Sequence, residues 1–294
     1  GDGTAESPRR AREEMITVRR GHILQDGYDQ LAALPAAALR RVLRVRFVSE
    51  LGLGEAGIDH NGVFKEFLEE TVKAAFDGNL GLFRTTAAAN KAFYANPHSA
   101  RALGGDDERL LAFVGRILGK ALYEGVTLDV PLAPFFVRRV LGGANPLDEL
   151  PSLDPQLHAS LQFVKHHTGD VADLCLSFCV DVECLGARER VDLRPGGSAV
   201  AVDNGNRIQY VHLVGDYYLN RQISAQAKAL RKGLFAVLQP GWLRLFSARE
   251  VGALLAGDDT EIDVDDLRRH TAYYGGYHDM SPTIRALWQG LREV

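Results

Sequence analysis

Residues 43–70, LRVRFVSELGLGEAGIDHNGVFKEFLEE, contain the pattern that decides the fold. The first eight residues, 43–50, alternate apolar and charged side chains, which predicts a half-buried β-strand. From Phe64 to Ala75 the apolar positions recur at helical spacing and charged side chains take the opposite positions, which predicts an amphipathic helix. The stretch therefore predicts a strand, a glycine-rich turn and a helix in that order.

The turn itself has the spacing G-x-G-x-x-G, formed by Gly52, Gly54 and Gly57. In a dinucleotide-binding oxidoreductase such glycines let backbone N–H groups approach a pyrophosphate, and a second parallel strand ends in an acid about 20 residues further on. Asp77 stands at that distance but follows a helical pattern, and no strand rich in Val and Ile precedes it. Dinucleotide binding is thus one reading of these glycines, and an ordinary turn is the other.

Several further helices are predicted downstream. One covers about 107–122 and could be capped by Asp106 or Asp107, so the phosphate-loop-like run GRILGK (115–120) falls inside it. Another follows Pro131, and helical patterns return from residue 216. The last helix is expected to begin at Ser281 and Pro282 and to bury four side chains. These are Ile284, Leu287, Trp288 and Leu291.

Residues 149–217, which we call the insert, differ from the rest of the chain in sequence pattern, with short apolar runs, cysteines and turn signals. The run DLCLSFCVDVE (173–183) alternates cleanly and predicts one strand with Leu174, Leu176, Phe178, Val180 and Val182 on one face. The turn signal RPGG at 194–197 is expected to return the chain for a partner strand. The insert therefore predicts a small α+β unit between two helical segments.

Two patterns raise the question of metal binding. The three cysteines have the spacing C-x3-C-x4-C without a close C-x-x-C pair, which disfavours zinc, and side chains among alternating Leu and Phe are expected to pack as small hydrophobes. The acidic residues of 258–266 lack the central glycine and terminal glutamate of a calcium loop, so they indicate a charged helix entry. The cysteines are Cys175, Cys179 and Cys184.

Composition excludes several classes of protein. Of the 294 residues, 46% are hydrophobic and 24% charged, which is the balance of a globular chain and excludes disorder throughout. The net charge of −4 has the wrong sign for nucleic-acid binding by a basic surface, and no apolar run is long enough to span a membrane. The polar start resembles no signal peptide, and three cysteines indicate a reducing compartment, so we expect the cytoplasm or the nucleus.

The opening stretch resembles the start of the HECT domain of ubiquitin ligases. The family pattern G-x-D-x-x-G-h-x-K-E-F is met by Gly57, Asp59, Gly62 and residues 65–67. Similar blocks follow in family order. The resemblance as a whole covers the chain from about Ile16 to its end. They are FVGRILGKALYEGVTLDVPLAPFF (113–136), DELPSLDPQLHASL (148–161), NRIQYVHLVGDYYLN (206–220) and TAYYGGYHDMSPTIRALW (271–288), and the wording at 44–59 and 148–154 is most similar to the branch with an upstream IQ motif.

The resemblance implies a mainly helical α+β fold, that of a HECT N-lobe. It predicts a large helical subdomain formed by 16–148 and 218–294, and the insert as a smaller α/β subdomain that recruits the ubiquitin-conjugating enzyme. The small, polar and charged residues at the start of the chain predict a solvated tail at 1–15. In family members a hinge then leads to a C-lobe that carries the thioester cysteine. The chain is expected to end at that hinge, so the C-lobe is expected to be absent.

The implied parent protein is a ubiquitin transferase that works through a C-lobe cysteine in an H-T-C-F-like setting. Nothing in this sequence matches that setting, so the chain alone is expected to be inactive and its three cysteines should not inherit the role. A non-catalytic binding module of the same fold is the alternative. The expected partners are a ubiquitin-conjugating enzyme, ubiquitin, and protein substrates held by regions outside this chain, with no cofactor, metal, nucleic acid or membrane.

The resemblance also assigns the recruitment surface. Family members hold an aromatic loop residue of the conjugating enzyme in an apolar groove of the insert. Leu157 and Leu161 are four residues apart on one predicted helix face, and Tyr210 can supply an amphipathic wall. Ordinary core packing is the alternative for the two leucines. The matching positions are Leu157, Ser160, Leu161, Cys175 and Tyr210, and Cys175 stands where relatives usually have a larger apolar residue.

Overall fold

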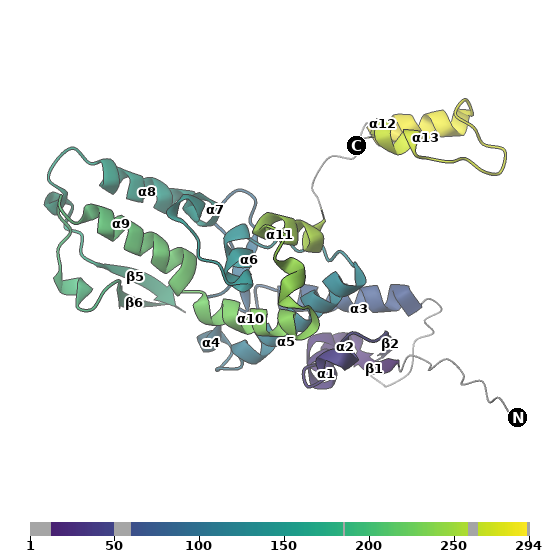
Figure 1. Cartoon of the computed structure of the whole chain (residues 1–294), viewed down its shortest axis with the longest axis horizontal. Coiled ribbons are helices and arrows are strands. Elements are labelled where there is room, and N and C mark those ends of the chain that lie inside the picture. The colour runs from purple at the N-terminus through teal and green to yellow at the C-terminus, as the bar shows by residue number, and fades with distance from the viewer. Residues whose placement is uncertain (1–12, 50–59, 185, 258–263, 293–294) are drawn as a thin grey trace, which may run out of the picture. The chain divides into compact units, whose positions relative to one another are not determined.

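The computed structural model describes residues 13–49, 60–184, 186–257 and 264–292. Contacts divide the chain into two compact units, Gly1–Gly257 and Asp258–Val294, and each is described by itself. Most of the described residues are helical and the strands form three two-stranded sheets, which confirms the predicted α+β, mainly helical class (Figure 1). None of the described helices has both the length and the apolar character needed to cross a membrane.

The first unit opens with two parallel strands, β1 (Glu14–Arg19) and β2 (Leu43–Val48). Helices α1 (Ile23–Leu31) and α2 (Ala36–Leu39) lie between them in sequence, as a crossover between parallel strands requires. The strand predicted at 43–50 is therefore confirmed, with its end two residues earlier. The turn predicted at Gly52, Gly54 and Gly57 lies outside the described residues.

A charged contact holds the end of β1 to α1. The Arg19 backbone N–H and guanidinium donate three hydrogen bonds of 2.6–3.0 Å to the Asp26 carboxylate. The guanidinium lowers the pKa of Asp26 below its ordinary value of 3.8, mainly through the side-chain hydrogen bond. A lowered pKa in the folded state stabilises the fold above the unfolded value, and this stabilisation disappears as the pH falls through the folded value.

We therefore expect Asp26→Asn to be less stable than the unsubstituted chain at pH 7. The difference should shrink as the pH falls below the ordinary value of 3.8 and through the lowered pKa of folded Asp26, because the carboxylate is protonated first in the unfolded chain and then in the folded one. Urea denaturation at a series of pH values measures both curves. A difference that stays constant down to the lowest pH would show that the carboxylate charge contributes nothing.

The centre of the unit is a pair of packed helices, α5 (Asp107–Glu124) and α10 (Ser224–Val237). The predicted apolar stripe of α5 is buried at Val114, Ile117, Leu118 and Ala121, and the run 115–120 is helical as predicted. The helices approach so closely that a Cβ atom added at Gly115 would lie 2.1 Å from the Leu230 carbonyl oxygen. These glycines therefore serve helix packing and hold no phosphate.

The predicted cap of α5 differs from the structure. Asp106 stands at the N-cap position but makes no capping hydrogen bond with its side chain. Asp107 is buried, and its carboxylate accepts a 2.6 Å hydrogen bond from the Ser99 hydroxyl of α4 (Ser99–Ala102). The acidic side chain that seemed suited to capping thus ties a short neighbouring helix to α5 instead.

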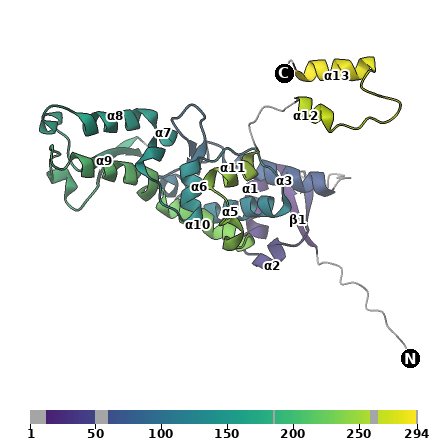
Figure 2. The same cartoon turned by 45° about the horizontal axis from the view of Figure 1, so that its top comes forward.

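The first unit without the insert is called the large part, and its remaining elements lie around this helix pair. Helix α3 (His60–Ala75) and the hairpin of β3 (Phe83–Thr85) and β4 (Phe93–Ala95) precede α5. Helix α6 (Pro134–Leu141), the helix predicted after Pro131, packs against α10 and α11 (Ala248–Ala256) (Figure 2). Leu219, Ile223, Ala227, Leu230 and Leu234 are all buried, which confirms the stripe expected from residue 216.

Helix α11 begins with a capping box. The Ser247 hydroxyl accepts from the Glu250 N–H at 3.2 Å, and the Glu250 carboxylate accepts from the Ser247 N–H at 2.7 Å. Ser247→Ala removes one of these bonds, so we expect it to lower the free energy of unfolding by about 1 kcal/mol. Thermal denaturation of the two chains measures the difference, and equal midpoints would refute a stabilising role for the cap.

The insert lies at one end of the first unit (Figure 1). It contains α7 (Leu150–Leu153), α8 (Pro155–His166), the antiparallel hairpin of β5 (Cys179–Cys184) and β6 (Ala187–Asp192), and α9 (Arg207–Asp216). Helices α8 and α9 pack against each other. The pairing of helices with a hairpin agrees with the expected α+β unit.

Two details of the expected strand are wrong. Residues 171–174 form a 3-10 turn, in which the Asp170 carboxylate accepts from the Ala172 N–H at 3.0 Å, so only 179–184 is a strand. Its partner strand β6 precedes the 194–197 turn instead of following it. That turn returns the chain to 176–178, where the Phe178 N–H donates to the Val200 carbonyl at 3.1 Å.

In the second unit, the loop 270–281 joins α12 (Val264–Arg269) to α13 (Pro282–Arg292). Asp265 and Asp266 lie in the first turn of α12, as a charged helix entry predicts, while 258–263 lie outside the described residues. Helix α13 starts at Pro282 as expected, but of its four predicted core side chains only Trp288 is buried. A unit this small has one short helix to cover α13, so Leu287 and Leu291 stay exposed within it.

Candidate functional site

Helix α8 carries three of the five predicted docking residues. It starts sharply because the Asp154 carboxylate accepts from the Gln156 and Leu157 N–H groups, both at 2.9 Å, and Pro155 takes the first helical position. Leu161 faces inward and is buried, Leu157 is half-buried, and Ser160 is exposed. The helix therefore offers a partly apolar surface at Leu157 and Ser160, with Leu161 beneath it as core.

Tyr210, the fourth residue, lies on α9. Only 8% of it is exposed, and its ring meets the Phe178 ring edge-on at 5.7 Å between centroids. The Phe178 ring also contacts the Arg194 guanidinium, whose carbon lies 4.0 Å from the ring centroid. Burial raises the pKa of Tyr210, with a smaller contribution from Cys179. Its hydroxyl therefore stays neutral at physiological pH and can donate a hydrogen bond.

Cys175, the fifth residue, lies on the connection between the 3-10 turn and β5. It is exposed and has a left-handed backbone conformation with φ of 51°. Its thiol lies 3.7 Å from the Asp173 carbonyl oxygen. The expectation that the cysteines pack as small hydrophobes is met by Cys184, which is buried, and is wrong for Cys175, because the strand that should have carried Cys175 begins only at Cys179.

The structure joins four of the five residues through the contact of α8 with α9. Leu157, Leu161 and Tyr210 belong to or pack against the same hydrophobic core, with Ser160 beside them on the α8 surface. The set thus combines two buried side chains, Leu161 and Tyr210, with the half-buried Leu157 and the exposed Ser160. Cys175 stands apart on its own connection.

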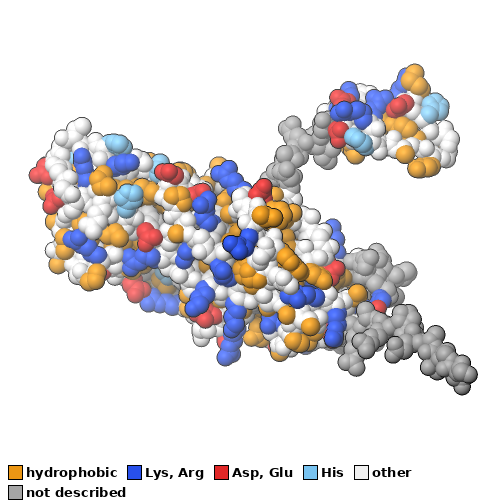
Figure 3. Space-filling view, viewed as in Figure 1, with side chains coloured by type: hydrophobic (Ala, Val, Ile, Leu, Met, Phe, Trp, Pro, Cys, Tyr) orange, Lys and Arg blue, Asp and Glu red, His pale blue; other side chains and the backbone are white. Residues whose placement is uncertain are grey.

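Sequence analysis missed two large apolar side chains on the same pair of helices. Phe163 of α8 is 59% exposed, with its ring 5.2 Å from the His167 ring, and Ile208 of α9 is 45% exposed. Phe163 lies outside the helical stripe of Leu157, Leu161 and Val164, and this position is the sequence signal that could have identified it as exposed. Figure 3 shows several histidine side chains on the surface at the insert end of the first unit. The insert thus presents more apolar surface than the five predicted residues alone.

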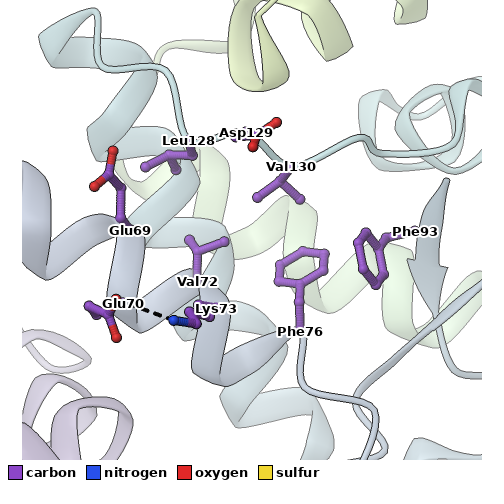
Figure 4. A pocket seen from close by; sticks show the side chains of 9 residues that line it. All are labelled: Glu69, Glu70, Val72, Lys73, Phe76, Phe93, Leu128, Asp129 and Val130. Atoms are coloured by element: carbon purple, nitrogen blue, oxygen red, sulfur yellow. Dashed lines mark ion pairs between the residues drawn. The ribbon is translucent and has the colours of Figure 1, made fainter.

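The large part contains a cavity of about 480 Å³ (Figure 4). Its floor is apolar, formed by Val72 of α3, Phe76 directly after α3, Phe93 of β4, and Leu128 and Val130 after α5. Its rim is mostly acidic, and Lys73 is paired with Glu70 at 3.7 Å. The lining residues are Glu69, Glu70, Val72, Lys73, Phe76, Phe93, Leu128, Asp129 and Val130, a set without a serine, cysteine or histidine nucleophile.

The dinucleotide reading finds no support in the described chain. There the sheets are all two-stranded, whereas dinucleotide binding needs a parallel sheet of several strands. Asp77 follows the end of α3 and accepts from the Asn79 N–H at 2.9 Å, which is a turn contact. In the same described residues, no three side chains suited to a metal ion come together.

Comparison with known proteins agrees with this architecture. Residues 69–294 match the family model of the HECT domain (ubiquitin transferase). Relatives include Ubiquitin-protein ligase E3B of Homo sapiens, which is 43% identical over 93% of the chain. Others are the Probable E3 ubiquitin protein ligase C167.07c of Schizosaccharomyces pombe, at 44% over 94%, and E3 ubiquitin-protein ligase UPL6 of Arabidopsis thaliana, at 40% over 94%.

The family model covers well over half of the chain, so the chain belongs to the HECT-domain family of ubiquitin transferases. The resemblance read from the sequence is thereby confirmed. The match spans 26% of the length of each of these three relatives.

Proposed function

We propose that this chain is the N-lobe of a HECT-type ubiquitin ligase and docks a ubiquitin-conjugating enzyme on the insert. The observation that carries the proposal is the packed pair α8 and α9, which presents Leu157 and Ser160 above a buried Leu161 and Tyr210. The residues that contribute most to binding usually cluster in a well-packed part of an interface. Two exposed apolar side chains, Phe163 and Ile208, lie on the same pair of helices.

In the proposed reaction the parent protein accepts ubiquitin as a thioester. The thiolate of a ligase cysteine attacks the thioester carbonyl of the loaded conjugating enzyme, and the conjugating enzyme's thiolate leaves. A substrate lysine amine then attacks the new thioester, loses a proton and releases the ligase thiolate. The role of the chain described here is to hold the conjugating enzyme for the first of these transfers.

None of the three cysteines is proposed as the thioester nucleophile. A catalytic thiolate needs a base, a cation or a helix N-terminus beside it. Cys184 has the Arg101 guanidinium beside it but is buried, out of reach of a ubiquitin thioester. The Cys179 thiol lies 3.1 Å from the Ser177 hydroxyl, and the Cys175 thiol has a backbone carbonyl as its neighbour. Cys175 is exposed on its own connection, and it stays in the proposed docking set only as the family resemblance assigns it.

Calorimetric titration of this chain with a panel of purified ubiquitin-conjugating enzymes tests the proposal. We expect saturable one-to-one binding to at least one member, of modest affinity because the exposed apolar surface is small. A Leu157→Ala chain should bind the same member more weakly while keeping its melting temperature close to that of the unsubstituted chain. Absence of binding to every member, or binding unchanged in Leu157→Ala, would refute the assigned face.

A further inference from the structure

Two segments of the chain connect the insert to the large part, and these segments run next to each other. The chain enters through the segment that follows α6, and it leaves through the end of α9 toward α10 (Figure 2). The two crossings contact each other at Gly215, where an added Cβ atom would lie 2.3 Å from the Leu147 side chain. The direction of the insert is therefore set where these two crossings meet.

Two buried asparagines, Asn145 on the entering crossing and Asn220 on the leaving crossing, bond to each other there. The Asn145 N–H donates to Asn220 Oδ1 at 2.8 Å, and Asn220 Nδ2 donates back to the Asn145 carbonyl at 3.1 Å. Asn145 Nδ2 also donates to the Phe135 carbonyl at 2.9 Å and the Leu219 carbonyl at 3.0 Å. Both side chains are less than a tenth exposed.

The helix is irregular at the same point. Residues Tyr217–Arg221 form a π-helical turn between α9 and α10, and Asn220 Nδ2 donates to the Asp216 carboxylate at 3.0 Å across it. Such turns insert an extra residue, and they recur where a helix changes direction or serves a site. Next to it, the Arg221 guanidinium donates to the Leu193 carbonyl of the insert at 2.8 Å.

We propose that Asn145 and Asn220 are positioning residues that lock the orientation of the insert relative to the large part. The reciprocal bonds join the two crossings, and the bond to Phe135 anchors them to α6. The asparagines lie at the base of the insert and not on the face of α8 and α9 assigned to docking, so they act on direction and not on affinity. The link to ubiquitin transfer rests on the proposed function, but the lock itself does not.

Residual dipolar couplings of the ¹⁵N-labelled chain test the lock. In the unsubstituted chain, amides of the insert and of the large part of Gly1–Gly257 should fit one alignment tensor. In Asn145→Ala and in Asn220→Ala the insert should need a separate tensor of smaller magnitude, because its orientation then varies. Gln226→Ala is the matched control: this buried amide donates to the Pro97 carbonyl at 3.2 Å within the large part, so its loss should leave one tensor.

A second measurement separates failure of the lock from failure of the docking proposal. The dissociation constant of a bound conjugating enzyme should change by less than about twofold in Asn145→Ala, because distant sites act independently. One shared tensor in both asparagine variants overturns the lock, whatever binds. Loss of the single tensor in Gln226→Ala as well would also overturn it, because the effect would then follow from any lost buried amide.

Discussion

Replacing Gly233 by alanine is expected to lower the free energy of unfolding of the first unit by more than about 3 kcal/mol. Gly233 lies in α10 at its contact with α5, and an added Cβ atom would lie 1.8 Å from the Ala112 carbonyl oxygen and 2.9 Å from the Arg116 backbone nitrogen. Neither atom belongs to a flexible side chain. The two central helices must therefore move apart, which loosens every side chain packed between them.

The partner helix α5 also has glycines at this contact. Gly115 and Gly119 of α5 face α10, and added Cβ atoms there would lie 2.1 Å from the Leu230 carbonyl oxygen and 2.9 Å from the Leu234 carbonyl oxygen. Small residues on both helices thus allow the backbones to approach. The large cost expected for Gly233→Ala arises because the partner surface is backbone on both sides and cannot adjust by changing rotamers.

Gly252→Ala is the matched control in the same unit. Gly252 lies in α11, where the nearest atom to an added Cβ is the Leu132 carbonyl oxygen at 3.9 Å, an ordinary contact. Alanine favours helix over glycine, so this variant should be unchanged or more stable by up to about 1 kcal/mol. Urea denaturation followed by circular dichroism measures all three chains. Equal stability of Gly233→Ala and the unsubstituted chain would contradict the close helix contact.

The second large effect is expected at the docking face. Ser160→Arg should weaken binding of a ubiquitin-conjugating enzyme by at least about tenfold, or 1.4 kcal/mol, because it places a long charged side chain beside Leu157 on the exposed margin. The wild-type hydroxyl donates to the Gln156 carbonyl of its own helix at 2.9 Å, and an exposed helical position tolerates arginine. The fold should therefore survive the change.

Ala253→Arg supplies the control for this substitution. Ala253 is also an exposed helical residue, but it lies in α11 and outside the insert. The same arginine introduced there should leave the dissociation constant unchanged. Equal weakening by both substitutions would mean that added positive charge, and not the position of Ser160, determines the loss.

Much of the helical framework could be predicted from the chain itself. The stripe of α5 and the spacing from Leu219 to Leu234 show the helical period plainly, and the structure buries both. The glycines of GRILGK could not be interpreted in the same way, since their purpose depends on Gly233, which lies far along the chain. Local sequence shows that a glycine is present, but only the fold shows which backbone approaches it.

The insert shows where local pattern fails. Alternation through residues 173–183 predicted one strand, but the Asp170 carboxylate favours a 3-10 turn and the strand begins at Cys179. Alternating side chains cannot distinguish these possibilities, because a short turn also buries every second or third residue. The exposure of Cys175 follows from this difference.

The docking residues themselves were reached through family resemblance. Leu157 and Leu161 were placed correctly on one helix, since their spacing of four residues is a local property. The position of Tyr210 depends on the Phe178 ring, which comes from a distant part of the insert, so no local pattern could supply it. Phe163 went unnoticed because one exposed phenylalanine has no period.

Mapping by NMR tests the central claim most directly. The ¹⁵N-labelled chain is titrated with an unlabelled ubiquitin-conjugating enzyme that it binds, and amide shifts are followed. We predict that the largest changes fall on α8, on residues 171–175 and on α9, with α5 and α10 unaffected. Changes concentrated elsewhere, for example around Phe76 and Asp129 in the cavity of the large part, would contradict the assignment of docking to the insert.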